Sequence, residues 1–243
     1  MTTVITTFSK DGYELYGHRM IDSWIKFWPQ DYHLIVYTEG YNIIEKDVRI
    51  TCIDINQACP NLDRFKKLSQ EMSDRYKKST IDKTIKWCHK VYAIGHALNA
   101  EQNYLVFLDG DTYTKKTIDP TFPMQLVGPN LFAVHFEKLK HGLHFETGLI
   151  VFNLKHPDIL WLKNIITTAY DTMEIYSMPK TWDGYWFVHL YTKYRLPVAD
   201  LSRQGAGVFG HPLVKPYLQH DVGTKKYRMA GYDKFTGRKT ISK

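Results

Sequence analysis

The chain has 243 residues, of which 44% are hydrophobic, so it is long enough and apolar enough to bury a core of its own. Its formal net charge of +7 makes anions reasonable partners, but the sign alone does not choose among nucleic acid, a membrane surface and phosphorylated metabolites. Its three cysteines, Cys52, Cys59 and Cys88, include no close CxxC pair, which argues against a disulfide framework and against a zinc site.

The sequence carries no recognisable targeting or membrane-spanning segment. The N-terminus, MTTVITTFSK, lacks the pattern of a secretory signal, and no run of about eighteen apolar residues occurs. We therefore expect a soluble, cytoplasmic protein without a membrane span.

The first forty or so residues predict a strand, a helix and a second strand. VITTF (Val4 to Phe8) has the composition of a strand, and a helix with apolar residues at three- and four-residue spacing follows until Pro29 stops it. HLIVYT (His33 to Thr38) is the second strand. This order is the start of a βαβ unit, in which the strands are parallel by default.

The middle of the chain continues the alternation. Val48 to Ile55 is a third β-branched run, and the pattern from Asn61 to about Ala100 is helical. Tyr104 to Leu108 is then a short strand that looks buried.

The second half predicts fewer regular elements. Leu131 to Phe136 and Leu149 to Leu154 are strand candidates, and Asp158 to Tyr170 is an amphipathic helix. Beyond Tyr176 only short aromatic segments occur, and the chain ends in a glycine- and lysine-rich stretch. With no repeat or linker to divide it, the chain predicts one α/β domain over 1–243: an open, mainly parallel, twisted sheet flanked by helices, with an irregular C-terminal portion.

The Tyr104 strand runs directly into Asp109, Gly110 and Asp111. Alternate residues of an extended chain point to one side, so both carboxylates can face the same space. Such a pair repels itself unless a divalent cation such as Mg²⁺ or Mn²⁺ accepts both oxygens and fills its other positions with water and phosphate. Gly110 has no side chain and would let a phosphate approach, and ligands of open α/β sheets lie off the carboxyl ends of strands.

The aspartate pair is also compatible with a simple turn, since Asp-Gly-Asp is good turn chemistry. A phosphatase of the haloacid dehalogenase type would use the first Asp as a nucleophile, but its motif continues with Gly-Thr at the first strand, whereas Thr112 and Tyr113 follow here. A noncatalytic binder of nucleic acid or of nucleotide sugars is a third alternative, although acidic side chains repel nucleic-acid phosphates unless a metal lies between.

Four segments resemble a known family, the GT-A type nucleotide-sugar glycosyltransferases, in their retaining branch of glycogenin-like and lipopolysaccharide-galactosyltransferase-like enzymes. VFLDGDT is similar to the family's strand and DxD motif, and HFETGLIVFNLKHP to the segment that lines the transferred sugar, with Glu146 where the family commonly has Asn. TWDGYWF resembles an Asp-Gln-Asp segment of which only Asp183 is retained. HDVGTKK repeats the His-x-x-Gly-x-x-Lys spacing near the C-terminus, without the Trp that usually follows.

The resemblance implies roles for individual residues, in addition to the fold. It implies that Asp109, Asp111 and His220 bind Mn²⁺ (or Mg²⁺), that Asp109 also reaches the ribose, and that Glu146 and Asp183 contact the transferred sugar. It also implies that the loop after the first strand, with Thr6, Thr7 and Phe8, contacts the base and ribose. The diphosphate would be bound by Lys90, Gly223 and Lys226.

Some assignments stay open. Glu146 would act as a nucleophile or stabilise an oxocarbenium-like centre, or else it bonds a sugar hydroxyl or caps the turn before Thr147. Tyr13 is a candidate stacking partner of the base, and Trp182, Tyr185 and Trp186 would form either a platform for the acceptor sugar or a buried aromatic cluster.

The function that the resemblance implies is a metal-dependent, hexosyltransferase-type reaction. A sugar would pass from a nucleoside diphosphate sugar, expected to be a UDP-sugar, to a carbohydrate or glycoconjugate acceptor with retention of configuration, and nucleic acid would not be a partner. The nucleotide would bind to about 1–115 and the acceptor to about 116–243.

Overall fold

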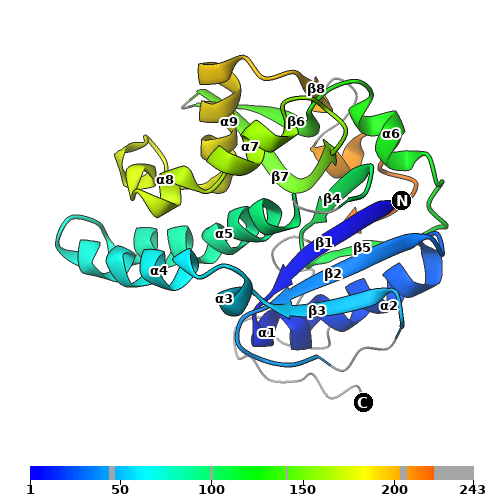
Figure 1. The fold of residues 1–243 in the computed structure, drawn as a ribbon, viewed down its shortest axis with the longest axis horizontal. Coiled ribbons are helices and arrows are strands. Elements are labelled where there is room, and N and C mark those ends of the chain that lie inside the picture. Colours follow the sequence, from blue (N-terminus) through cyan, green and yellow to red (C-terminus); the bar gives the residue numbers. More distant parts are fainter. Residues whose placement is uncertain (44–46, 99–100, 141, 203–206, 222–243) are drawn as a thin grey trace.

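A computed structural model describes residues 1–43, 47–98, 101–140, 142–202 and 207–221 (Figure 1). A seven-stranded sheet in the order β3-β2-β1-β4-β7-β6-β8 forms its centre. The strands of this sheet are β1 (Thr2–Phe8), β2 (Tyr32–Thr38), β3 (Ile50–Asp54), β4 (Tyr104–Leu108), β6 (Phe132–Leu139), β7 (Gly142–Asn153) and β8 (Val198–Asp200).

The sheet is mixed but mainly parallel. β1 pairs in parallel with β2 and with β4, and β2 with β3, so the carboxyl ends of these four strands share one edge. β7 runs antiparallel to β4 and β6, and β8 is parallel to β6. The α/β sheet predicted from the sequence is thereby confirmed.

Helices cover both faces of the sheet (Figure 1). Alternate strand residues serve the two faces: Ile5 and Phe107 pack into the layer that holds α5, whereas Val4 and Leu108 pack into the layer that holds α2. The helices are α1 (Lys10–Gly12), α2 (His18–Phe27), α3 (Ile55–Ala58), α4 (Asn61–Glu71), α5 (Lys78–Ala97), α6 (Phe122–Val127), α7 (Ile159–Ile165), α8 (Thr168–Asp171) and α9 (Asp183–Tyr194), joined by a π-helical turn at Tyr13–Gly17 and 3₁₀ turns at Met72–Asp74, Glu174–Ser177 and Val208–Gly210.

The structure corrects several boundaries. The helical region expected from Asn61 to about Ala100 is two helices, because the chain leaves α4 through a 3₁₀ turn and restarts only at α5. The helix expected over Asp158 to Tyr170 is likewise divided into α7 and α8. The strand expected to start at Leu149 begins earlier, since β7 already pairs with β6 through Phe145 and Glu146.

The segment beyond Tyr176 is more regular than its composition predicts. It contains the twelve-residue helix α9 and the short strand β9 (Leu218–His220). Outside the main sheet, β9 pairs antiparallel with β5 (Thr112–Thr114), which comes earlier in the chain. Thr112 lies opposite His220 in this pairing. The small sheet thus brings the end of the described chain back to the residues that follow β4.

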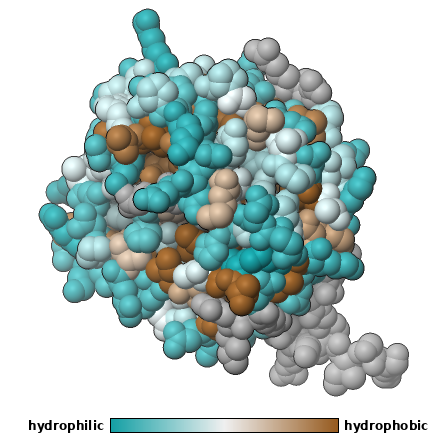
Figure 2. Space-filling model, turned by 45° about the vertical axis from the view of Figure 1, so that its right-hand side comes forward, coloured by the Kyte–Doolittle hydropathy of each residue, from teal (hydrophilic) through white to brown (hydrophobic). Residues whose placement is uncertain are grey.

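The hydropathy of one face of the molecule gives few hints of function. The face in Figure 2 is largely hydrophilic, with hydrophobic residues in small separate patches. Within the part of the chain that the structure describes, no helix is long and apolar enough to cross a membrane. The three cysteines are free, as expected.

Helix α9 packs unusually close to β7, and Gly184 makes this possible. A Cβ atom on Gly184 would collide with the carbonyl oxygen of Phe145 and with the His144 ring. We expect Gly184→Ala to lower the free energy of unfolding by about 1–3 kcal/mol, because backbone atoms cannot move aside as a flexible side chain can. Urea denaturation followed by circular dichroism measures the change.

Gly95→Ala, in the last turn of α5, is the matched control. A Cβ on Gly95 would lie 3.1 Å from the Cγ2 methyl carbons of Ile166 and Thr167. Those side chains can shift, and alanine favours a helix interior over glycine by about 1 kcal/mol. A Gly184→Ala variant as stable as Gly95→Ala would contradict the tight α9–β7 contact.

Candidate active site

The two aspartates stand where β4 ends and the chain turns back. Asp109 N–H donates to the Gly148 carbonyl at 2.9 Å, which extends the β4–β7 pairing by one residue. Thr112 N–H then donates to the Asp109 carbonyl at 2.9 Å and closes the turn. Gly110 is required by packing as well, because a Cβ there would lie 2.5 Å from Cε1 of Phe8.

His220 reaches this turn through the β5–β9 pairing. Its Nε2 lies 2.7 Å from Oδ1 of Asp111 and 4.0 Å from Oδ2 of Asp109. The next residue is fixed too: Asp221 N–H donates to the Asp111 carbonyl at 3.2 Å, and its buried carboxylate accepts from Arg19 on α2. The backbone that carries the imidazole is therefore fixed by the β5–β9 pairing and by the contacts of Asp221.

These three side chains fit a divalent metal ion. One ligand atom from each of Asp109, Asp111 and His220 can be chosen so that all lie within 4.8 Å of one another. Two hard carboxylate oxygens and one imidazole nitrogen suit a divalent cation.

Two opposing effects act on the pKa of His220. Burial lowers its pKa, but the hydrogen bond and charge of Asp111 raise it, with help from Asp109 and Glu146, so the net pKa is raised. A metal ion bound by this imidazole would have to compete with a proton.

Lys90 of α5 contacts Asp109 from the side away from His220. Its buried Nζ lies 2.9 Å from Oδ1 of Asp109 and 3.1 Å from Oδ2 of Asp183, and it donates to Thr147 Oγ1 at 2.9 Å. Thr147 Oγ1 in turn donates to Asp183 at 2.6 Å. Burial alone would lower the pKa of Lys90, but the two carboxylates outweigh it and the pKa is raised, so the ammonium stays charged.

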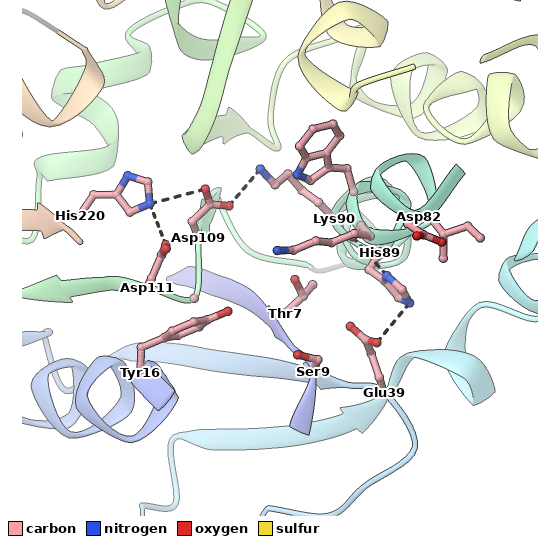
Figure 3. Close-up of a pocket in the computed structure, with 14 residues that line it drawn as sticks. Thr7, Ser9, Tyr16, Glu39, Asp82, His89, Lys90, Asp109, Asp111 and His220 are labelled. Atoms are coloured by element: carbon pink, nitrogen blue, oxygen red, sulfur yellow. Dashed lines mark hydrogen bonds and ion pairs between the residues drawn. The ribbon is translucent and has the colours of Figure 1, made fainter. Parts of the chain in front are cut away.

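A cavity of about 610 Å³ opens beside the aspartates (Figure 3). It lies at the carboxyl ends of β1, β2 and β4, with α5 along one side. The described residues that line it are Thr7, Ser9, Tyr16, Glu39, Asp82, Ile85, Lys86, Trp87, His89, Lys90, Asp109, Gly110, Asp111 and His220.

No family model and no curated protein sequence matches this chain. Solved structures do match. Mouse xyloside xylosyltransferase 1 in its apo form superposes with a TM-score of 0.54 at 12% sequence identity, over 84% of this chain and 87% of that one. An active-site mutant of LgtC superposes with a TM-score of 0.52 at 14% identity, over 91% and 87% of the two chains.

The chain has the GT-A fold. The family resemblance read from the motifs is confirmed to that extent. At such low identity the likeness establishes the fold and leaves the chemistry to be argued from the site.

Within this GT-A fold, the residues of the expected nucleotide loop differ in their exposure to the cavity. Thr7 lines the cavity, but the side chains of Thr6 and Phe8 are buried in the core, and Phe8 packs its ring against Gly110. The roles of Thr6 and Phe8 stay predictions, and with both side chains buried they would rest on backbone groups. Tyr16, one helical turn beyond the expected Tyr13, lines the cavity.

The two residues expected to contact sugar have other partners. Oε2 of Glu146 accepts from Val208 N–H at 2.8 Å and lies 4.0 Å from His135 Nε2. Asp183 is buried against Lys90 and Thr147. Neither Glu146 nor Asp183 is among the described residues that line the cavity, so their roles stay predictions. Gly223 and Lys226 lie outside the described residues.

Part of the aromatic cluster belongs to the core, and part lies against the cavity wall. Trp182 is half-buried and meets Trp87 of the cavity wall with ring centroids 5.4 Å apart. Trp186 is buried and donates its indole N–H to the Ile166 carbonyl, so it cannot belong to a platform. Tyr185 is also buried, with its ring centroid 5.8 Å from that of Trp182.

Sequence reasoning missed Glu39, Asp82, Lys86 and His89. The three helical residues recur at spacings of four and three, which places them with Lys90 on one face of α5. A polar stripe along one face of this helix was the available signal. Glu39 follows β2 directly, so the rule that located Asp109 at a strand's carboxyl end would have located it as well.

Asp183 should stabilise the fold through Lys90. Asp183→Asn keeps the shape and an acceptor for Thr147 but removes one of the two negative charges beside the buried ammonium. We expect a loss of about 1.5–3 kcal/mol in the free energy of unfolding, the range for hydrogen bonds to charged groups. Urea denaturation measures it.

Asp82→Asn is the control, because Asp82 is an exposed carboxylate of the same cavity wall. Its replacement should change the free energy of unfolding by no more than about 0.5 kcal/mol. Equal effects of the two substitutions would refute the structural role of the Lys90–Asp183 pair.

Proposed function

We propose that this protein is a metal-dependent glycosyltransferase that moves a sugar from a nucleoside diphosphate sugar to a carbohydrate or glycoconjugate acceptor. The observation that carries the proposal is the Asp109–Asp111–His220 cluster at one end of a ligand-sized cavity in a GT-A fold. The motif resemblance favours a UDP-sugar donor and retention of configuration.

The chain would use its three ligands in distinct ways. Lys90 takes Oδ1 of Asp109, which leaves Oδ2 on the side of His220. Lys90 thus acts as a positioning residue for a metal ligand, in the manner of outer-shell groups around metal sites. A divalent ion held there would neutralise the negative charge that develops on a departing diphosphate.

The diphosphate contacts would come from the segment after β9. Gly223 lies three residues beyond His220, and three residues of extended chain reach at most about 10 Å. Gly223 and, three residues further, Lys226 are therefore within chain reach of the metal cluster. We assign them, with Lys90, to the negative charge of the leaving group.

The transferred sugar would lie near Glu146 and Asp183. Gly148 places this part of β7 against the metal cluster, since its Cβ position lies 3.3 Å from Oδ2 of Asp109. Asp183 lies in the same region, because it accepts a hydrogen bond from Thr147, the residue that follows Glu146. Trp182 and Trp87 would offer ring faces to the C–H surfaces of an acceptor sugar.

Metal-dependent nucleotide binding is the primary test. At a hundredfold excess over its Kd, UDP with Mn²⁺ should raise the melting temperature by about 5–10 °C, and UDP with a chelator should raise it far less. Asp111→Asn should lose the metal-dependent part, because an amide is a poor replacement for a carboxylate ligand. Differential scanning fluorimetry with UDP-, GDP- and CMP-sugars, coupled to an assay of sugar hydrolysis, gives the readout.

Asp63→Asn, an exposed carboxylate on α4, should behave as wild type in this test. If no nucleotide stabilises the protein in a metal-dependent way, the transferase proposal fails. Release of phosphate from simple phosphomonoesters would instead support a phosphatase.

Glu146→Gln separates the roles open to Glu146. Glutamine keeps an acceptor for Val208 N–H but cannot act as a nucleophile or carry negative charge. If the carboxylate faces the anomeric carbon, turnover should fall by about 10²-fold or more with the Kd for UDP unchanged.

Glu137→Gln on the neighbouring strand β6 is the control, because Glu137 is an exposed carboxylate 3.3 Å from His144. Turnover of Glu146→Gln within a few-fold of wild type would eliminate the nucleophile. Glu146 would then be left with hydrogen bonding alone.

A further inference from the structure

Glu39 and His89 form a second polar pair, remote from the aspartates. Both line the cavity, and Figure 3 shows them beyond Thr7 and Ser9, at the end away from His220. Glu39 directly follows β2, and His89 projects from α5. Oε2 of Glu39 lies 3.7 Å from Nε2 of His89, which is too long for a hydrogen bond.

The surroundings of His89 decide which of its nitrogens carries hydrogen. Nδ1 lies 3.3 Å from the carbonyl oxygen of Lys86, and a carbonyl can only accept, so Nδ1 is the protonated nitrogen. Burial lowers the pKa of His89 below its ordinary value, although the charge of Glu39 opposes this. The ring is therefore neutral near pH 7, and Nε2 presents a lone pair.

This arrangement leaves two hydrogen-bond acceptors facing one another. His89 is only 4% exposed, and its buried Nε2 has no hydrogen-bond partner among the described residues. The Glu39 carboxylate is an acceptor as well. A buried acceptor without a partner is costly, and a donor placed between the two would satisfy both.

We propose that Glu39 and His89 form the nucleoside end of the donor site, where both accept hydrogen bonds from an N–H or O–H group of the nucleoside. This inference rests on the proposed function. At the opposite end of the cavity, a metal ion held by Asp109, Asp111 and His220, with Lys90 beside them, would suit the diphosphate. The Glu39 end repels phosphate and suits a neutral group that carries donors.

Two parts of a nucleoside offer such donors. Uracil has an imide N–H and guanine an N–H next to an amino group, and ribose has two adjacent hydroxyls. The position of Glu39 favours neither, because acids at the carboxyl ends of parallel strands also bind ribose hydroxyls. The shared requirement is a hydrogen-bond donor, and chemically modified nucleotides separate the two sources.

The test is isothermal titration of the full-length protein with UDP in the presence of Mn²⁺. Glu39→Gln preserves the side-chain shape but removes the charge and replaces one acceptor oxygen by a donor. It should raise the Kd for UDP by about 10- to 100-fold, as expected for the loss of a charged hydrogen bond. Glu71→Gln, an exposed glutamate at the end of α4, is the control and should leave the Kd unchanged.

The same two proteins are then titrated with N3-methyl-UDP and with 2′,3′-dideoxy-UDP. If Glu39 accepts from the base, the ratio of variant to wild-type Kd should fall close to one with the N3-methyl compound. If it accepts from the ribose, the ratio should collapse with the dideoxy compound instead. GDP, with its N1-methyl and dideoxy analogues, replaces UDP if the wild type binds it more tightly.

The outcomes are separable from those of the proposed function. A wild-type protein that binds neither UDP nor GDP with Mn²⁺ refutes the donor site as a whole. If the wild type binds but Glu39→Gln has the same Kd, the inference about Glu39 and His89 is overturned while the donor site survives. A ratio that stays high with both analogues also overturns it, because Glu39 would then act without contacting either group.

Discussion

The repulsion between Asp109 and Asp111 is the constraint around which this region is built. Two carboxylates on alternate residues at the end of a buried strand need positive charge from more than one direction. Lys90 contributes it to Asp109 from α5, and the imidazole of His220 on β9 makes a hydrogen bond with Asp111. Because α5 precedes the two aspartates in sequence and β9 follows them by more than a hundred residues, the aspartate pair links these two segments. Asp183 completes the arrangement by sharing Lys90.

The contribution of β9 shows how a local pairing creates a distant contact. β5 has only three residues, yet its antiparallel partner delivers His220 to a point more than a hundred positions away in sequence. Arg19 explains why so short a sheet is held in place, since it bonds the buried Asp221 and lies over the Tyr113 ring. The imidazole is thereby fixed by the β5–β9 backbone pairing and by α2 as well as by its contact with Asp111.

The sequence predicted the parts of this site that depend on chain direction and spacing. Asp109 and Asp111 follow from the rule that ligands lie off the carboxyl ends of strands, and His220 follows from a motif spacing. Glu39 and His89 escaped because each is a single residue without a motif, and their relation exists only after β2 and α5 pack together. Packing also revised roles: Gly110 was attributed to phosphate approach, but the ring of Phe8 already demands a glycine there. The break between α4 and α5 escaped for a similar reason, since the apolar periodicity continues across it.

The distribution of charge along the cavity limits what can occupy it. One end gathers Lys90, His220 and two carboxylates that are suited to a cation, whereas the other presents the acceptors of Glu39 and His89. A ligand that satisfies both ends must carry negative charge and metal affinity at one end and neutral hydrogen-bond donors at the other. A simple phosphomonoester meets only the first condition, and a nucleic-acid strand would bring phosphate to the acidic end as well. A nucleoside diphosphate meets both, because its anionic and neutral halves are joined in one small molecule, and the fold places the cavity where such a molecule would lie along the strand ends.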